Sequence, residues 1–331
     1  MKTVLKTSAL CKSYFKRKFL FGKTEEKPVL KNINLELREN RVLGLVGESG
    51  CGKSTLCKVL LGIEDISSGT AEVLGRNIAQ ISKKQFKSLR RKMQVVFQNP
   101  YASLDPRMNI YQLLSEPLDI HGLYPKQAER KSYLLSLLAD VGLSEEHLLR
   151  YPHEFSGGQR QRIAIARALV LKPQFLIADE PVSALDVSVQ AQILNLLKQI
   201  QKERNLTMLF VTHDFAVARF LCDDIAVMYQ GEIVEYAQTE DLFACPQHPY
   251  TQMLLDAVPS VQIGKKEQKN ISEEYPNRKD WACPFAPRCA YAEEKCKKQK
   301  IGLQPVSAHQ TCACCVLPFS HGINSTVTED K

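Results

Sequence analysis

The clearest pattern begins at residues 29–37, where apolar and polar residues alternate as they do along a half-buried strand. A continuous apolar run follows at residues 42–46 and ends at Gly47, which is typical of a strand buried on both faces. Residues 54–61 then have the spacing of a helix. A buried strand, a glycine-rich loop and a helix together predict one βα unit.

Three more apolar runs have the character of strands in a parallel sheet, and helical periodicity fills much of the sequence between them. The predicted strands are residues 94–97, 175–178 and 208–211, and the most regular predicted helices are residues 127–141 and 190–202. We therefore predict an α/β core that carries a mainly helical subdomain over about residues 99–171.

The composition changes after about residue 262, where the chain becomes polar and has little apolar surface to bury. This change predicts a first domain at residues 1–262 and a linker at residues 263–282. A cysteine-rich extension is predicted at residues 283–318, and a polar tail at residues 319–331.

Composition places the chain among ordinary globular proteins, with 44% hydrophobic and 24% charged residues. No stretch reaches the roughly 18 to 20 apolar residues that a membrane span needs. Lysines interrupt the first residues, unlike the apolar core of a secretory signal, so we expect a cytoplasmic protein. The net charge of +8 fits either a solvated basic surface or attraction to an anionic membrane or nucleic acid, and charge alone does not decide between them.

Residues 47–54, GESGCGKS, fit the phosphate-binding pattern G-x-x-x-x-G-K-[ST] between the strand and the helix that this pattern requires. The glycines let backbone N–H groups cradle phosphates, Lys53 reaches the β- and γ-phosphate oxygens, and the Ser54 hydroxyl coordinates Mg²⁺. The residues expected to contact ATP in this segment are Gly47, Glu48, Ser49, Gly50, Cys51, Gly52, Lys53, Ser54 and Thr55.

Two carboxylates, Asp179 and Glu180, end the predicted strand at residues 175–178. At the carboxyl edge of the sheet, beside the phosphate loop, Asp179 is expected to bind the metal and Glu180 to polarise the attacking water. The alternative is an acidic pair that caps a helix beginning near Pro181.

Residues 155–162, FSGGQRQR, resemble the signature segment of ABC ATPases and lie just upstream of the two carboxylates, as that family requires. Gln98 in VFQNP resembles the family's Q-loop glutamine, Asp186 in SALD its D-loop aspartate, and His213 in VTHD its switch histidine. Tyr14 stands where the family places an aromatic residue that stacks on adenine, with ordinary packing as the alternative.

The resemblance implies a RecA-like core with a helical subdomain and a small antiparallel β region. It also implies that two subunits close head to tail around two ATPs, so that an isolated subunit is a poor ATPase. One subunit is expected to supply Lys53, Ser54, Gln98, Asp179, Glu180 and His213, with Mg²⁺ held by Ser54, Gln98 and Asp179. The other is expected to supply its signature residues Ser156 and Gly158, and Gly157, Gln159 and Asp186 complete the expected nucleotide contacts.

The segments HPYT at residues 248–251 and QNPYASLDPR at residues 98–107 resemble the oligopeptide and dipeptide importer branch, and residues 19–22 resemble the F-type of its two ATPases. This resemblance implies a subunit on the cytoplasmic face of the plasma membrane that binds no nucleic acid. Its implied partners are a D-type ATPase or a second copy, two membrane-spanning permeases and an extracytoplasmic peptide-binding protein. Residues 98–107 would meet the permeases' coupling helices. Nickel and glutathione are alternative cargoes within the branch.

Six of the eleven cysteines lie in the last 49 residues, a crowding that indicates a metal or cluster more than a disulfide framework. Four thiolates suit such a cluster, and by resemblance to the branch we predict a [4Fe–4S] cluster on Cys283, Cys289, Cys296 and Cys314. Cys312 and Cys315 are alternatives for the fourth ligand. Zinc, or a reduced segment without metal, are the alternative states.

Two other classes of function predict features that this sequence lacks. A non-transport ABC ATPase acting on DNA or ribosomes would carry two cassettes or a long coiled coil between Lys53 and Ser156, but the chain has one phosphate loop and about 100 residues in that interval. A metal-dependent regulator that acts through its cysteine-rich tail, with incidental ATP binding, would not need Gln98, Glu180 and His213 together.

Overall fold

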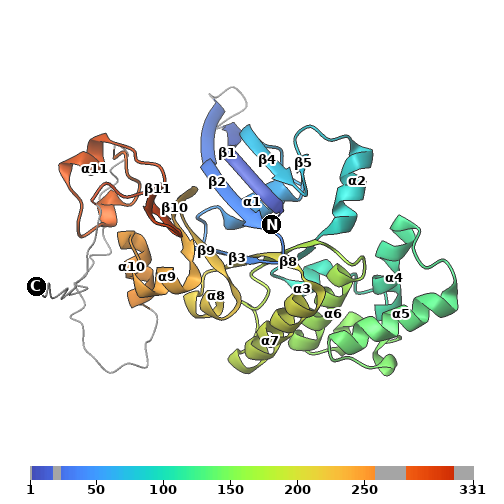
Figure 1. Ribbon diagram of the computed structural model, residues 1–331. Coiled ribbons are helices and arrows are strands. Elements are labelled where there is room, and N and C mark those ends of the chain that lie inside the picture. The colour runs from blue at the N-terminus through green and yellow to red at the C-terminus, as the bar shows by residue number, and fades with distance from the viewer. Residues whose placement is uncertain (1, 18–23, 258–280, 317–331) are drawn as a thin grey trace, which may run out of the picture.

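The fold is described from a computed structural model, which defines residues 2–17, 24–257 and 281–316. Two sheets lie one above the other, and most of the larger helices lie on the far side of the lower, larger sheet (Figure 1). The predicted linker up to residue 280, the tail at residues 319–331 and the segment at residues 19–22 lie outside the described residues. Within the described ranges, none of the helices combines the length and the apolar character that a membrane span requires.

The larger sheet has eight strands in the order β11-β12-β10-β9-β3-β8-β7-β6. Its parallel part comprises β6 (Met93–Val96), β7 (Phe175–Asp179), β8 (Thr207–Thr212), β3 (Val42–Val46) and β9 (Asp224–Tyr229). Its antiparallel edge comprises β10 (Glu232–Gln238), β12 (Gln310–Cys312) and β11 (Gln304–Ser307). Every residue of β3, β8 and β9 is buried, which explains why the central strands are continuous apolar runs in the sequence.

The smaller sheet is antiparallel, with the order β2-β1-β4-β5. Its strands are β1 (Thr3–Arg17), β2 (Thr24–Arg38), β4 (Ser68–Val73) and β5 (Arg76–Asn77). Along β2 buried and exposed residues alternate because one face packs on the core and the other meets solvent. The alternation at residues 29–37 therefore predicted this strand correctly.

The helices divide between the two faces of the larger sheet. On the face toward the smaller sheet lie α1 (Lys53–Leu60) and α2 (Lys83–Lys92). On the opposite face lie α3 (Pro100–Ser103), α4 (Ile110–His121), α5 (Gln127–Asp140), α6 (Gly157–Leu169), α7 (Val187–Arg204) and α8 (Phe215–Leu221). The remaining helices are α9 (Thr239–Ala244), α10 (Pro249–Asp256) and α11 (Glu294–Lys298), with short 3-10 turns at Glu145–His147, Pro152–Glu154 and Ala286–Arg288.

Successive side chains of β3 point into two separate hydrophobic cores. Val42 and Val46 pack with the helical subdomain, whereas Leu43 and Leu45 pack with α1 and the smaller sheet. The sheet therefore separates α1 from α6. The predicted α/β fold of an ABC ATPase cassette is confirmed.

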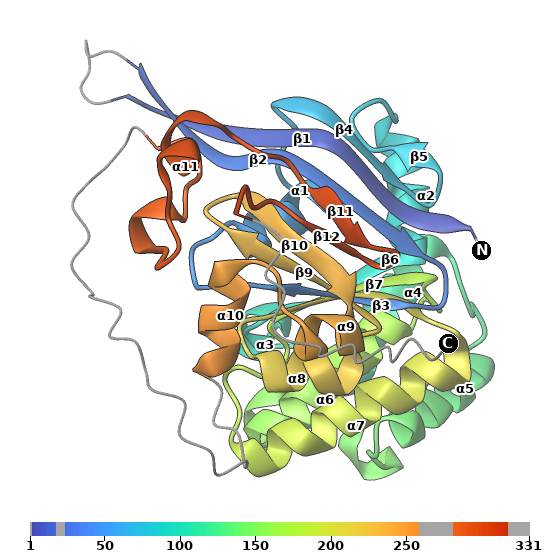
Figure 2. The ribbon, with the colours of Figure 1, turned by 60° about the vertical axis from the view of Figure 1, so that its left-hand side comes forward.

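The cysteine-rich extension joins the larger sheet, because β12 pairs with β10 in antiparallel register (Figure 2). At the junction the fully buried Glu235 carboxylate accepts hydrogen bonds from Gln247 N (2.8 Å), His248 N (2.9 Å) and Gln310 Nε2 (2.7 Å). These donors come from the segment between α9 and α10 and from β12. One carboxylate therefore holds both segments, and the hydrogen bonds compensate for the burial of its charge.

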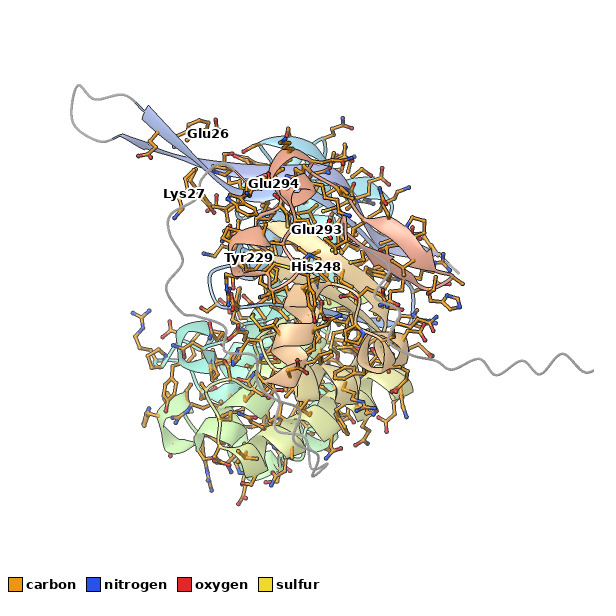
Figure 3. All side chains as sticks on the ribbon, turned by 90° about the vertical axis from the view of Figure 1, so that its left-hand side faces the viewer. Glu26, Lys27, Tyr229, His248, Glu293 and Glu294 are labelled. Atoms are coloured by element: carbon orange, nitrogen blue, oxygen red, sulfur yellow. The ribbon has the colours of Figure 1, made fainter. Side chains whose placement is uncertain are left out.

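An aromatic cluster lies beside this junction and consists of Tyr229, His248, Tyr250 and Phe285. Tyr229 and His248 lie on the same side of the molecule as Glu293 and Glu294 of the extension (Figure 3). Phe285 belongs to the extension and is only 2% exposed, so its burial helps to hold the extension against α10.

The buried His248 makes the stability of this junction depend on pH. Its Nδ1 accepts a hydrogen bond from Tyr250 N (3.1 Å) as the N-cap of α10, and burial lowers the pKa of His248 from 6.5 to about 3. Between these values the unfolded chain binds a proton that the folded chain does not, so stability falls as the pH falls. We expect a loss of about 2 kcal/mol from this residue between pH 7 and pH 5.

Urea unfolding at pH 7 and pH 5 measures this loss. The variant His248→Asn keeps a capping oxygen but does not titrate, so its stability should change less with pH than that of the unchanged chain. The same substitution at exposed His309 is the control and should retain the full pH dependence. Equal pH dependence in the unchanged chain and in His248→Asn would show that His248 is not the responsible group.

Candidate nucleotide site

The phosphate-loop lysine is folded back over its own loop. Lys53 Nζ donates to Gly47 O (2.7 Å) and Glu48 O (3.1 Å) and lies 3.8 Å from Glu180 Oε1, and the side chain is only 4% exposed. All three partners are oxygen atoms. When ATP binds, its phosphate oxygens can therefore replace them as acceptors for the Lys53 ammonium group.

The loop between β3 and α1 depends on glycine at two positions where a side chain has no room. A Cβ on Gly47 would lie 2.2 Å from Met228 O on the neighbouring strand. Gly52 has φ +116°, which favours glycine, and a Cβ there would lie 2.9 Å from the Met228 methyl carbon. The glycines of the motif therefore fix the path of the loop at the start of α1, where helix N–H groups face an anion.

The predicted magnesium ligands Ser54 and Asp179 lie together: Ser54 Oγ donates to Asp179 Oδ1 (3.3 Å). Desolvation raises the pKa of Asp179, and the hydrogen bond from Ser54 partly offsets that effect. A hydroxyl and a carboxylate are hard oxygen ligands that suit Mg²⁺, which takes few protein ligands and completes its shell with water and phosphate. These residues fit the ion.

Glu180 is the centre of a polar network at the end of β7. Its Oε2 accepts a hydrogen bond from Gln98 Nε2 (3.1 Å) and lies 3.5 Å from His213 Nδ1, while Lys53 approaches Oε1. The side chain is 15% exposed, and the backbone adopts φ +46°, a left-handed conformation that is uncommon outside glycine. The structure thus brings together the catalytic residues predicted from three separate motifs.

Gln98 has a second partner that the sequence did not single out. Its Nε2 also approaches Ser183 Oγ (3.4 Å), and Ser183 Oγ donates to Glu180 O (3.1 Å). Ser183 thus joins the glutamine to the backbone of the glutamate. Ser183 is the first residue of the D-loop segment SALD, and its position in that motif was the sequence feature that could have identified it.

The signature residues form the start of α6, on the opposite face of the sheet from α1. Ser156 Oγ accepts from Gln159 N (3.3 Å), and Gln159 Oε1 accepts from Ser156 N (3.0 Å), a capping box that fixes the helix start. A Cβ on Gly158 would lie 2.5 Å from Val189 Cγ1, so this glycine allows α6 to approach α7. Asp186 caps α7 by accepting from Val189 N (2.9 Å).

Tyr14 lies on β1 with 36% of its surface exposed, and Lys12 Nζ stands 5.0 Å from its ring centroid. Lys12 in turn pairs with Glu64 (3.0 Å) and donates to Asp65 O (2.8 Å), just after α1. The ring is accessible enough to stack on a base. Its contact with adenine stays a prediction.

Two residues outside the predicted site also contact the phosphate loop. Tyr250 Oη accepts a hydrogen bond from Glu48 N (3.0 Å), and the Arg288 guanidinium binds the Glu48 carboxylate. Tyr250 was quoted only as part of a family hallmark, and Arg288 is 240 residues from its partner, so neither contact had a local signal in the sequence.

Five cysteines of the extension line one small cavity of about 30 Å³: Cys283, Cys289, Cys296, Cys314 and Cys315. They include all four predicted ligands, whereas Cys312 is buried on β12 beside Glu235. Desolvation raises the pKa of the Cys283, Cys289 and Cys314 thiols, in the case of Cys289 to about 11. Across the described residues, no group of three or more His, Cys, Asp or Glu side chains is arranged so that it could hold a metal ion.

Comparison with known families gives two matches on this chain. Residues 30–183 match the family described as ABC transporter, and residues 234–296 match the family described as the C-terminal region of the oligopeptide/dipeptide transporter. The first match contains the phosphate loop and both carboxylates. The second contains α10 and three of the cavity cysteines.

Curated relatives align over most of their length. The putative oligopeptide transport ATP-binding protein of Bacillus subtilis is 43% identical over 91% of this chain and 93% of its own length. The oligopeptide transport ATP-binding protein OppF of Streptococcus pyogenes is 49% identical over 79% and 86%, respectively. The dipeptide transport ATP-binding protein DppF of Haemophilus influenzae is 44% identical over 94% and 96%.

Solved structures share the fold of the first domain. An ATP-binding cassette solved as a dimer in a post-hydrolysis state, bound to ADP and Pi, aligns with a TM-score of 0.63 and 30% identity, over 71% of this chain and 98% of the other. A subunit of an ABC transporter complex from Clostridium perfringens aligns with the same TM-score and identity, over 74% and 92%.

The network around Glu180 predicts the effect of removing its charge. The substitution Glu180→Gln keeps the shape of the side chain and one acceptor oxygen but removes the base that would polarise water. We expect ATP binding to persist, hydrolysis to fall by about 10²-fold or more, and a closed dimer to accumulate with ATP. Turnover assays and size-exclusion chromatography with ATP measure these effects, and hydrolysis at the native rate would show that Glu180 is not the base.

Proposed function

We propose that this chain hydrolyses ATP to drive the import of peptides. The chain belongs to the ABC transporter family and to its oligopeptide and dipeptide transport ATP-binding branch. Members of this family are ATPases whose hydrolysis is coupled to transport. The observation that carries the proposal is the combination of the Glu180 network with a C-terminal region that matches the peptide transporters. Inward transport is part of the proposal.

The proposed reaction is phosphoryl transfer from ATP to water. Lys53 and the N–H groups at the start of α1 bind the phosphates, and Glu180 accepts the proton of the attacking water. Gln98 and His213 hold the Glu180 carboxylate at the edge of the site. Asp179, Ser54 and Gln98 would hold Mg²⁺, which would neutralise charge on the phosphate oxygens.

A second subunit completes each site in this proposal. The signature serine and the start of α6 provide anion-binding groups, but α6 lies across the sheet from its own phosphate loop. The solved relative that binds ADP and Pi is a dimer, which supports the same arrangement here. A partner of the D-type would make this chain the F-type subunit of a heterodimer, and a second copy would make a homodimer.

The membrane partners are proposed to meet the segment after Gln98. Tyr101 in α3 is 61% exposed, and the Arg160 guanidinium lies 3.9 Å from its ring centroid. Because Arg160 belongs to α6, contact between Tyr101 and a permease helix would shift the start of α6, where the signature residues lie. The complete machine would contain two permeases and an extracytoplasmic peptide-binding protein, with this chain at the cytoplasmic face of the membrane.

Peptide dependence of hydrolysis tests the proposed cargo. The assay uses this chain together with the two permeases and the second ATPase subunit in vesicles. The binding protein is added with or without bound peptide. We expect peptide-loaded binding protein to raise the ATPase rate severalfold, and a series of peptide lengths to define the preferred substrate. Hydrolysis that ignores peptide but responds to nickel or glutathione would transfer the proposal to those cargoes.

A [4Fe–4S] cluster in the cysteine cavity is the second part of the proposal. It rests on the crowding of cysteines in the extension and is supported by the position of the four expected ligands around one cavity. A cluster occupies more space than one ion, so its thiolates stand farther apart than zinc ligands do. Cys315, whose sulfur lies 3.2 Å from that of Cys296, is the alternative fourth ligand.

Metal analysis of anaerobically purified chain tests this part. We expect about four iron and four sulfide per chain, and a loss of both in Cys289→Ser, because a cubane needs four protein ligands. The matched control is Cys245→Ser, an exposed cysteine outside the extension. Zinc in place of iron, or neither element, would contradict the cluster.

A further inference from the structure

An ion pair joins the cysteine-rich extension to the phosphate loop. Arg288 Nη1 and Nη2 donate to Glu48 Oε2 and Oε1, each at 2.9 Å, in a two-pronged pair between the extension and the phosphate loop. Such a planar pair fixes direction as well as distance, which a single lysine contact would not.

The extension holds Arg288 firmly. The residue ends the turn Ala286–Arg288, which lies between Cys283 and Cys289 and is closed by Arg288 N donating to Phe285 O (2.9 Å). Phe285 is buried among Tyr229 and Tyr250, and the Arg288 guanidinium lies 5.8 Å from the Tyr229 ring centroid. A packed turn, flanked by the cavity residues Phe285 and Cys289, thus presents the guanidinium to the phosphate loop.

Glu48 is held on all its polar groups. Its backbone N–H donates to Tyr250 Oη (3.0 Å), its carbonyl accepts from Lys53 Nζ (3.1 Å), and its carboxylate binds Arg288. One residue of the phosphate loop therefore connects the catalytic lysine, α10 and the extension. A displacement of α10 or of the extension would therefore move Glu48 and, with it, the phosphate loop.

The charge of Glu48 gives this contact a function. A carboxylate within the loop that receives a polyphosphate opposes binding, because like charges repel over the few ångströms that separate them. Arg288 neutralises that carboxylate and holds it against the extension. The side chains are 26% and 39% exposed, so water screens the effect and limits its size.

We propose that Arg288 is a positioning residue of the nucleotide site, and that the cysteine-rich extension sets the affinity for ATP through its pairing with Glu48. The proposal goes beyond peptide import and holds for any cargo. It makes the extension a working part of the ATPase, because the turn that presents Arg288 is anchored at both ends by residues of the cysteine cavity.

The test is the affinity of the full chain for a magnesium complex of a non-hydrolysable ATP analogue, measured by calorimetry. We expect Arg288→Gln to weaken binding about tenfold, with a larger loss at low salt than at high salt. Arg288→Lys, which keeps the charge but loses the fork, should weaken binding less. The double variant Glu48→Gln/Arg288→Gln should recover most of the affinity, because the unpaired carboxylate is gone.

The matched control is Lys300→Gln. Lys300 Nζ pairs with Glu232 Oε1 (2.8 Å), so it also joins the extension to the cassette, but it does not reach the phosphate loop. We expect native affinity in this variant. Thermal unfolding of every variant separates loss of fold from loss of affinity.

Three results would overturn the proposal: equal affinity in Arg288→Gln and the unchanged chain, an equal loss in Lys300→Gln, or no recovery in the double variant. Absence of binding by the unchanged chain would overturn the nucleotide site itself, and this proposal with it. Failure of the peptide-stimulated ATPase assay, in contrast, would leave the affinities unchanged and concern the cargo alone.

Discussion

The carboxyl ends of parallel strands meet at one edge of a sheet, and the rest of this site depends on that constraint. β3 ends at the phosphate loop, β7 ends at Asp179 and leads into Glu180, and β8 leads to His213. In-register pairing of β7 with β8 and of β8 with β3 places these ends side by side. The Glu180 network is therefore a direct consequence of strand order.

The same sheet also divides the site. Because β3 sends alternate side chains into two cores, α1 and α6 are held on opposite faces. The phosphate loop and the start of α6 in one chain therefore cannot contact the same bound nucleotide in this arrangement. This layering supports the proposed composite site of two subunits, because no local movement of a packed helix would carry α6 through the sheet.

Both backbone and side-chain hydrogen bonds join the extension to the cassette. β12 adds to the antiparallel edge of the sheet, the buried Glu235 fastens β12 to the segment before α10, and Arg288 reaches the phosphate loop. Buried polar groups that are fully paired specify one arrangement of their neighbours. The cysteine cavity and the nucleotide site are consequently two ends of one packed unit.

The sequence by itself determined the elements whose signal is local: the alternation of β2, the apolar runs of β3, β7 and β8, and the phosphate-loop motif with the carboxylates at the end of β7. It also indicated Gln98, Glu180 and His213, because each sits in a short motif. Only the tertiary structure decided that Gln98 and His213 bind one carboxylate oxygen of Glu180, that β12 extends the sheet, and that Arg288 holds Glu48. The physical reason is that hydrophobic period and motif spacing describe neighbours along the chain, whereas these contacts join residues between 33 and 240 positions apart, whose meeting depends on strand order and on how the layers pack.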